Sequence, residues 1–400
     1  MKTDRLFFNK NLQIVFSVTL IAVMEVSIIT PVLPKITEAL SITAGKANLL
    51  IVVFTMPGII LSPLLGIAAD RFGRKNVLVP ALLLFGICGT LSGITRDFSL
   101  ILILRFFQGA GAACFGALNQ TIIGDIFPGK ERIEAMGYNS SVLSIGTMIY
   151  PSIGGSVALL GWYYPFFLST LAFPVALLVI FGLKYDEPVK SENIGSYLKE
   201  SFKLIKTKEV LSLYIGTLAA FILLYGILLS FFPFYIKEKF LVNTMIIGLA
   251  MSAGSVGAII GSFNLGRLSS KFSPKKLLVS AFLIYPIALS MSYFMPVIFL
   301  FIIPVFIYGF ANGILMPNIQ TQLSIFSPAK YRGAFMSINS SVLRLGQTIG
   351  PLISGIIITR YGSGYVFIAG IIFAIASALF IAYNVTDRGS FSDVKSKAQG

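Results

Sequence analysis

Three charged residues lie within long apolar runs of the sequence: Glu25, Arg105 and Arg344. A charged side chain at the middle of a bilayer costs roughly 2.5–3.5 kcal/mol on insertion scales, so such residues usually face a cavity and mark function. Glu25 is the only acidic residue so deep in an apolar run. A carboxylate shielded from water favours its neutral form. Glu25 is therefore a candidate proton carrier at physiological pH, and the alternative is a structural ion pair with an arginine.

The two arginines leave several roles open. Arg105 is either a cavity residue or a hydrogen-bonding link between helices. Arg344 is a candidate partner of Glu25, an anchor for an anionic substrate, or a structural residue. Histidine is absent, and the two cysteines lie within apolar runs. Catalytic sets and zinc sites that require histidine are therefore excluded, and we expect neither an enzyme, a metal site nor a cofactor.

The elements that position these charges are predicted membrane-spanning helices. Hydrophobic residues make up 56% of the chain and charged residues only 12%, whereas soluble domains carry about 25% charged residues. Apolar runs of about 20 residues predict spanning helices. We expect twelve, at residues 12–34, 47–69, 76–95, 98–121, 136–159, 162–184, 210–236, 244–268, 276–294, 297–321, 334–358 and 362–384.

The chain is an internal duplication with an offset of 200 residues. Residues 130–155 and 330–355 share 13 identities in 26 ungapped positions, including Asn139/Asn339 and Pro151/Pro351. This predicts an all-α membrane protein with two pseudo-symmetric six-helix halves. The halves are residues 1–184 and 210–384. Residues 185–209 are a cytoplasmic linker, read as a flexible segment or a surface helix, and residues 385–400 are a cytoplasmic tail.

The net charge of +15 follows the predicted topology and does not indicate nucleic-acid binding. With both termini inside, 23 of the 31 Lys and Arg residues lie in cytoplasmic loops and tails. Positive residues accumulate on the cytoplasmic side. We therefore expect a multi-pass protein of the cell membrane, plasma or inner, with both termini cytoplasmic and the lipid bilayer as its surroundings.

The loop after the second predicted span reads Gly-Ile-Ala-Ala-Asp-Arg-Phe-Gly-Arg-Lys over residues 66–75. It resembles the signature loop of the major facilitator superfamily. The resemblance implies a latch on the cytoplasmic side. Gly66 allows a tight helix contact, Gly73 a positive-φ turn, and Asp70 can meet a helix N-terminus or a nearby arginine. The predicted latch residues are Gly66, Asp70, Arg71, Gly73, Arg74 and Asp125.

Two further motifs narrow the resemblance. Residues 102–109, around Arg105, are similar to the buried-arginine motif of that superfamily. Residues 146–155 resemble its antiporter motif, with Tyr150 in place of a glycine. The predicted residues of this antiporter motif are Gly146, Pro151, Gly154 and Gly155. Together with Pro31-Val32-Leu33-Pro34, these motifs resemble the 12-span drug:proton antiporters over essentially the whole chain.

The family resemblance implies a central cavity lined by spans 1, 4, 7 and 10. The candidate cavity residues are Arg344, Arg105, Phe115, Tyr225, Tyr308 and Asn312. An apolar cavity with few polar anchors suits hydrophobic or amphiphilic molecules better than sugars.

The leading hypothesis is a monomeric, proton-coupled exporter of such molecules by alternating access, with the proton gradient as its energy source and no nucleic-acid partner. Two alternatives stay open. One is an exporter of an anionic metabolite or lipid that uses Arg344. The other is a non-transporting receptor with this fold.

Overall fold

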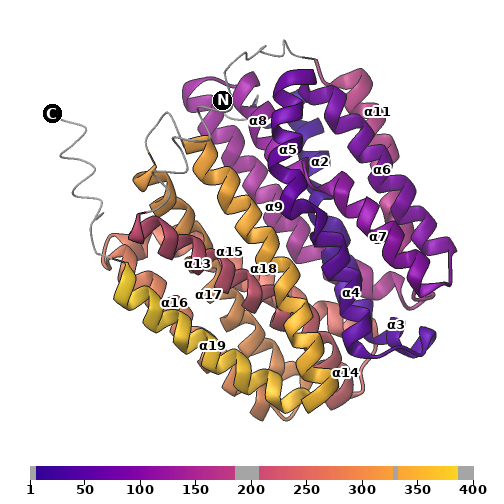
Figure 1. The fold of residues 1–400 in the computed structure, drawn as a ribbon, viewed down its shortest axis with the longest axis vertical. Helices are drawn as coiled ribbons and strands as arrows, with labels where there is room; N and C mark the ends of the chain where they lie inside the picture. Colours follow the sequence, from indigo (N-terminus) through magenta and orange to yellow (C-terminus); the bar gives the residue numbers. More distant parts are fainter. Residues whose placement is uncertain (1–5, 185–206, 328–331, 386–400) are drawn as a thin grey trace. The chain divides into compact units, whose positions relative to one another are not determined.

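The computed structural model describes residues 6–184, 207–327 and 332–385, and these residues form helices without strands (Figure 1). Within them, eleven helical spans are long and apolar enough to cross a membrane: Lys10–Leu40, Ala44–Phe72, Arg74–Ile94, Phe98–Ile126, Tyr164–Gly182, Lys208–Phe240, Thr244–Ser269, Pro274–Phe294, Ile298–Phe326, Phe335–Tyr361 and Ser363–Asn384.

The twelfth predicted span, 136–159, lies in a helix that is long enough to cross but less apolar. This helix, α9, covers Gly129–Val157. Its first turns hold charged residues and its middle carries Asn139 and several serines. Most of these hydroxyls bond to carbonyls one turn earlier, as Ser140 does to Met136 at 3.0 Å. The helix therefore supplies its own acceptors for polar side chains, which is the condition for placing them in lipid.

The residues divide into two units, Met1–Glu192 with Asn243–Leu249, and Asn193–Val242 with Ala250–Gly400. The linker and tail predicted at 185–209 and 385–400 fall almost entirely outside the described residues. The described helices of the first unit are α2 (Lys10–Ile29), η1 (Thr30–Val32), α3 (Leu33–Leu40), α4 (Ala44–Thr55), α5 (Pro57–Phe72), α6 (Arg74–Ile94), α7 (Phe98–Ala112), α8 (Phe115–Ile126), α9, α10 (Tyr164–Phe167), η2 (Leu168–Leu171) and α11 (Ala172–Gly182).

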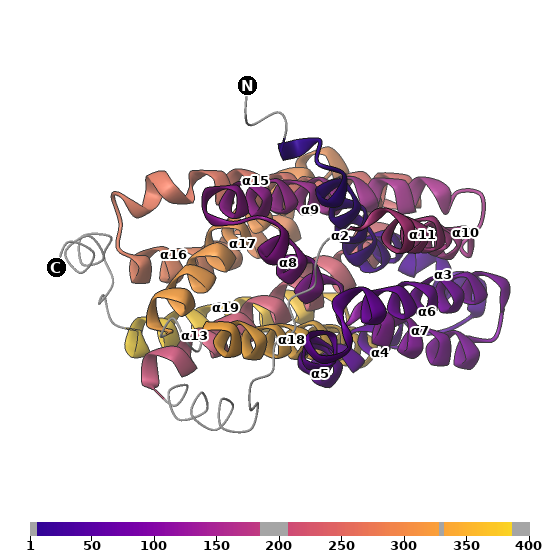
Figure 2. The same ribbon diagram turned by 90° about the horizontal axis from the view of Figure 1, so that it is seen from above.

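Two spans of the first unit are interrupted by short 3-10 turns. Span 1 passes through the 3-10 turn η1 at Pro31 and continues to Leu40, beyond the predicted end at residue 34. Span 6 passes through a second 3-10 turn, η2. Such turns within helices often mark functional positions. In this unit α2 packs against α9, α8 and α11, and α6 packs against α7 and α11 (Figure 2).

The second unit repeats this arrangement with different breaks. Its helices are α13 (Lys208–Leu223), the π-helix η3 (Leu224–Phe231), α14 (Phe232–Phe240), α15 (Thr244–Ser269, whose first residues belong to the first unit), α16 (Pro274–Phe294), α17 (Ile298–Phe326), α18 (Arg332–Tyr361) and α19 (Ser363–Asn384). Here α16 packs against α17 and α19, and α18 packs against α13 and η3.

The offset of 200 residues predicted from the sequence is present in the helix contacts. Ser62 Oγ donates to the carbonyl of Ala113 at 2.8 Å, and Ser262 Oγ donates to that of Gly313 at 2.9 Å. A Cβ atom at Gly109 would overlap the backbone of Phe54, and one at Gly309 would overlap the equivalent Gly254. The two units therefore share one packing scheme as well as one sequence pattern.

Candidate functional site

The deep carboxylate of Glu25 forms a buried ion pair with Arg105 inside the first unit. Glu25 lies on α2 and Arg105 on α7, and both side chains are essentially inaccessible to solvent, at 2% and 0%. The partner of Glu25 in this structure is thus Arg105. Of the arginine roles considered from the sequence, this geometry favours the ion pair with Arg105 over one with Arg344.

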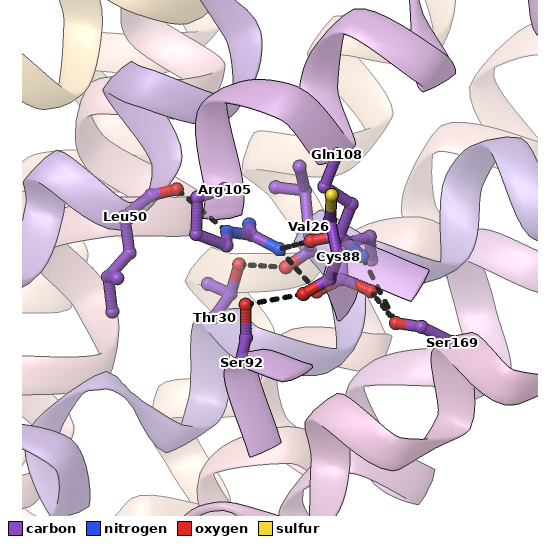
Figure 3. Close-up of polar contacts among 9 residues, drawn as sticks. Val26, Thr30, Leu50, Cys88, Ser92, Arg105, Gln108 and Ser169 are labelled. Atoms are coloured by element: carbon purple, nitrogen blue, oxygen red, sulfur yellow. Dashed lines mark hydrogen bonds and ion pairs between the residues drawn. The ribbon is translucent and has the colours of Figure 1, made fainter. Parts of the chain in front are cut away.

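Arg105 is fixed by four groups, and Figure 3 shows two of them, Leu50 and Gln108, beside it. Its Nη1 donates to Glu25 Oε1 and to Gln108 Oε1, the latter at 3.0 Å, and its Nε donates to the carbonyl of Leu50 at 3.1 Å. Its guanidinium carbon lies 4.4 Å from the centre of the Phe54 ring, in cation–π geometry. Its Nη2 donates to no acceptor among the described residues. The cation is therefore held in place mainly by neutral groups and balanced by one carboxylate.

Gln108 and Ser169 complete the site, and the sequence analysis did not assign a role to either. Gln108 Nε2 donates to Ser169 Oγ at 3.1 Å, and Ser169 Oγ donates to Glu25 Oε2 at 2.9 Å. Both side chains are fully buried. The available sequence signal was a glutamine one turn after an arginine that lies within an apolar run.

Gly89 on α6 allows this cluster to close. A Cβ atom there would overlap both Ser169 Oγ and Gln108 Nε2. The four side chains Glu25, Arg105, Gln108 and Ser169, called here the proton cluster, thus come from three spans and are packed against a fourth. Within such a site a charged pair is stable only as a pair, because an isolated buried charge is costly. Protonation of Glu25 would cancel its charge and leave Arg105 unbalanced.

A second polar cluster lies in the second unit. Arg344 Nη1 on α18 donates to Gln347 Oε1 at 3.2 Å, and Gln347 Nε2 donates to the hydroxyl of Tyr225 at 2.9 Å. Tyr225 belongs to the π-helix η3. Gln347 is buried, whereas Arg344 and Tyr225 are partly exposed. Arg344, Gln347 and Tyr225 are called here the arginine–tyrosine cluster.

The other candidate cavity residues fall into the packed interiors of their units. Phe115 is fully buried, with its ring 5.6 Å from that of Phe85. Tyr308 is also fully buried, 4.5 Å from the ring of Tyr285. Asn312 is partly exposed and donates to the Tyr285 hydroxyl at 3.2 Å. In this structure Phe115 and Tyr308 thus pack against other aromatic rings, and a cavity-lining role for them stays a prediction.

Three of the predicted latch residues, Asp70, Arg74 and Asp125, form an ion network within the first unit. Gly73 has φ of 93°, so the predicted positive-φ turn between α5 and α6 is confirmed. Arg74, buried at the start of α6, bonds Asp70 at 3.2 Å and forms an ion pair with Asp125 on α8. The expectation that Asp70 meets a nearby arginine is therefore confirmed, and the arginine is Arg74. Arg71 is exposed, with its guanidinium 5.6 Å from the centre of the Phe72 ring.

Gly66 does not make the tight helix contact that the sequence suggested. A Cβ atom there would meet no atom of the described structure within 4 Å. The reason is that α5 presents Gly66 toward open space in this conformation. Its contribution to the latch stays a prediction.

Residues of the antiporter motif on α9 lie very close to the backbones of neighbouring helices. Cβ atoms at Gly154 and Gly155 would overlap the carbonyls of Ile28 and Thr244, and one at Gly248 would overlap that of Pro151. Thr244 Oγ1 also donates to the carbonyl of Gly155 at 2.7 Å. Gly146 instead faces side chains of α2. Small residues permit such approaches between membrane helices, and Tyr150 does not prevent them.

Comparison with known proteins identifies the family. The family model described as Major Facilitator Superfamily matches residues 15–246 and 213–399. The chain is 27% identical over 355 residues to Multidrug resistance protein 2 of Bacillus subtilis, covering 86% of this chain and 88% of that one. It is 29% identical over 386 residues to Multidrug resistance protein 1 of the same organism, covering 94% and 96%.

Solved structures agree on the fold. A D-xylose-proton symporter superposes with a TM-score of 0.78 at 17% identity, covering 94% of this chain and 98% of that chain. The chain belongs to the Major Facilitator Superfamily. It is a transporter and not an enzyme, with the helical fold that the sequence predicted.

Proposed function

We propose that this protein is a proton-coupled exporter of hydrophobic or amphiphilic small molecules. The observation that carries the proposal is the proton cluster, where the deep carboxylate Glu25 is paired with Arg105 out of contact with solvent. Two relatives that align over most of both chains are named multidrug resistance proteins. Export of several apolar compounds by this chain is the function that these two facts support together.

The cluster suggests how a proton drives the cycle. With Glu25 ionised, Arg105 and the carboxylate neutralise each other, and Ser169 donates a further bond. Protonation removes the attraction, so Arg105 must find other acceptors and the contacts among α2, α7 and η2 weaken. A transporter must not leak protons, so Glu25 should exchange its proton only when the proton cluster is open to water. Protonation from outside then favours substrate release, and deprotonation inside favours reloading.

The test uses everted vesicles and purified protein. Vesicles that contain the full chain should accumulate a panel of hydrophobic dyes only while a proton gradient is present. In proteoliposomes, addition of a transported dye should change the internal pH, because a coupled exporter exchanges protons for substrate. Dye movement that is equally fast with and without the gradient would contradict proton coupling.

We also propose that the protein works as a monomer in the plasma or inner membrane, with both termini and residues 185–209 in the cytoplasm. The distribution of Lys and Arg supports this orientation. A cysteine introduced into residues 185–209 should react with an impermeant reagent only after the cells are permeabilised. Labelling in intact cells would mean that this segment lies outside the cell and that the proposed orientation is wrong.

A further inference from the structure

The turn between α15 and α16 carries four basic residues within ten positions: Arg267, Lys271, Lys275 and Lys276. These four residues are called here the basic turn. The side chains of Arg267, Lys271 and Lys276 are exposed, and that of Lys275 is partly exposed. The basic turn can therefore contact a partner that is not part of the chain.

The sequence around the basic turn supplies no acidic residue to balance this charge. Between Glu238 and Asp387 the chain contains neither Asp nor Glu. None of the four basic side chains forms an ion pair with another described residue. A surface with charges of one sign attracts molecules of the other sign. The charge of the basic turn is thus available to an external anion.

The equivalent turn of the first unit, one repeat earlier, has acidic residues at its centre. There Asp70 and Asp125 both form ion pairs with Arg74. The repeat positions of these two acidic residues are Ser270 and Ile325, which are neutral. The second unit therefore keeps a basic turn at this place without the internal partners that the first unit provides.

The backbone of the basic turn is held by hydrogen bonds. The amides of Lys271 and Phe272 both donate to the carbonyl of Leu268, at 3.0 and 2.9 Å. The side chain of Asn318 on α17 donates from Nδ2 to the carbonyl of Pro274, at 3.0 Å. The basic residues are therefore presented together from a defined turn rather than from a loose loop.

The residues beside the basic turn indicate what kind of anion it meets. Phe263 is 79% exposed and lies four residues before Arg267, and Phe272 is 49% exposed and follows Lys271. Residues four apart lie on the same face of a helix, so an exposed apolar surface leads directly to an exposed cation. Clusters of about four or more basic residues at the end of a membrane span are typical of binding sites for anionic lipids.

We propose that the basic turn binds the phosphate headgroup of an anionic phospholipid, with the acyl chains along the face of α15 that carries Phe263. The guanidinium of Arg267 can donate two parallel bonds to one phosphate, and the lysines add compact positive charges. This contact is with the surrounding membrane. It goes beyond the proposed function, because it does not depend on which molecule is exported or on protons.

The experiment measures binding of single lipids to the purified full chain in a neutral detergent. Phosphatidylglycerol is the anionic probe, and phosphatidylcholine with the same acyl chains is the probe without net charge. Bound lipid is counted by native mass spectrometry over a range of lipid concentrations. The wild-type protein should bind phosphatidylglycerol more tightly. Glycerol phosphate, which has the headgroup without acyl chains, should displace it only weakly.

Two variants change the charge of the basic turn in different ways. Each basic residue near an anionic lipid surface contributes about fivefold to binding. The double variant Lys275→Gln with Lys276→Gln should therefore weaken phosphatidylglycerol binding about 25-fold and leave phosphatidylcholine binding unchanged. Ser270→Asp adds the acidic group that the first unit has at Asp70, and it should weaken phosphatidylglycerol binding about fivefold.

The matched control removes two exposed basic residues that have acidic neighbours in the sequence. Lys130→Gln with Arg132→Gln makes the same loss of charge at the start of α9, beside Glu131 and Glu134. This control should change the affinity for either lipid by less than about twofold.

Four results would overturn the proposal. They are equal wild-type affinity for the two lipids, unchanged lipid preference in both variants of the basic turn, an equal loss in the control, and displacement of the lipid by glycerol phosphate at similar concentration. The last result would mean that the basic turn binds a soluble phosphate. If the double variant does not fold, Ser270→Asp decides by the same criteria.

Discussion

The two units place different chemistry at the same position of their first helix. Position 25 is Glu and its repeat position 225 is Tyr. In each unit an arginine donates to a glutamine three residues later, as Arg105 does to Gln108 and Arg344 to Gln347. The glutamine then reaches Ser169, a ligand of Glu25, in the first unit and Tyr225 itself in the second.

The two sites differ in whether the side chain beside the arginine can gain or lose a charge. The first unit pairs its arginine with a carboxylate, a group whose charge is cancelled when it takes up a proton. The second unit sets its arginine beside a phenol, which stays neutral at physiological pH because its ordinary pKa is about 10. The two arginine–glutamine pairs are not repeats of each other, since the repeat positions of Arg105 and Gln108 are Val305 and Tyr308. The two units therefore carry a similar hydrogen-bonding pair on non-equivalent helices, one beside a carboxylate and one beside a phenol.

The largest expected effect is at Glu25. Glu25→Gln keeps the size of the side chain and cannot ionise, so gradient-driven dye export in everted vesicles should fall to background. Dye binding should persist, because most of its affinity comes from apolar contacts. Glu38→Gln, at an exposed position near the C-terminal end of the same span, is the matched control and should export normally. Full gradient-driven export by Glu25→Gln would show that another residue carries the proton.

The next effect is on stability, at Arg105. Removing one member of a buried ion pair costs roughly 3–5 kcal/mol, because the other charge is left buried. Arg105→Gln should therefore lower the unfolding temperature in detergent, because the carboxylate of Glu25 would be left buried without its cation. The double variant with Glu25→Gln should recover much of the stability. Additive losses in the double variant would show that the two residues act independently.

The sequence predicted the fold because the apolar spans, the internal duplication and the uneven distribution of basic residues each extend over many residues. It also found Glu25 and Arg105, since a charge in an apolar run stands out. It did not pair them, because 80 residues separate them and hydrophobic patterning does not report which helix faces turn toward each other. Ser169 gave no signal of its own, because serines are common in these spans and only the break η2 turns this one toward Glu25. The cavity roles of Phe115 and Tyr308 stay predictions, since in this conformation both rings pack against other aromatic rings.

The latch network offers a smaller test of the same asymmetry. The first unit has Asp70 and Asp125 around Arg74, whereas the repeat position of Asp70 is Ser270, which donates to the carbonyl of Arg267. Asp125 is 13% exposed and Asp70 is 49% exposed. Asp125→Asn should cost about 1.5–3 kcal/mol, and Asp70→Asn about 1 kcal/mol or less, since exposed pairs are screened.

The readout for both variants is the distance between spin labels on the cytoplasmic ends of the helices. Each variant should express normally, transport more slowly and shift the distance distribution toward the inward-open state. Asp125→Asn should shift it further than Asp70→Asn. Ser270→Ala, the matched change in the second unit, should leave the distribution unchanged. An unchanged distribution in Asp125→Asn would reject a latch that depends on this network.

The smallest expected effect compares two buried threonine–asparagine bonds. Thr19 Oγ1 donates to Asn139 at 2.6 Å and accepts from Asn119 at 2.8 Å, whereas Thr217 Oγ1 bonds one asparagine, Asn339, at 2.8 Å. Hydrogen bonds between membrane helices contribute about 0.6 kcal/mol on average. Valine has the shape of threonine without the hydroxyl, so Thr217→Val should destabilise slightly and Thr19→Val about twice as much.

Unfolding can be followed with a thiol-reactive dye, because Cys88 and Cys114 are both buried and free. The first-unit variant Thr19→Val removes the bonds to both Asn139 and Asn119, and Asn119 keeps only its longer bond to the carbonyl of Val15 at 3.4 Å. The unfolding temperature should therefore decrease in the order wild type, Thr217→Val, Thr19→Val. Equal decreases would mean that the bond to Asn119 adds nothing, and that the first unit is no more dependent on buried polar contacts than the second.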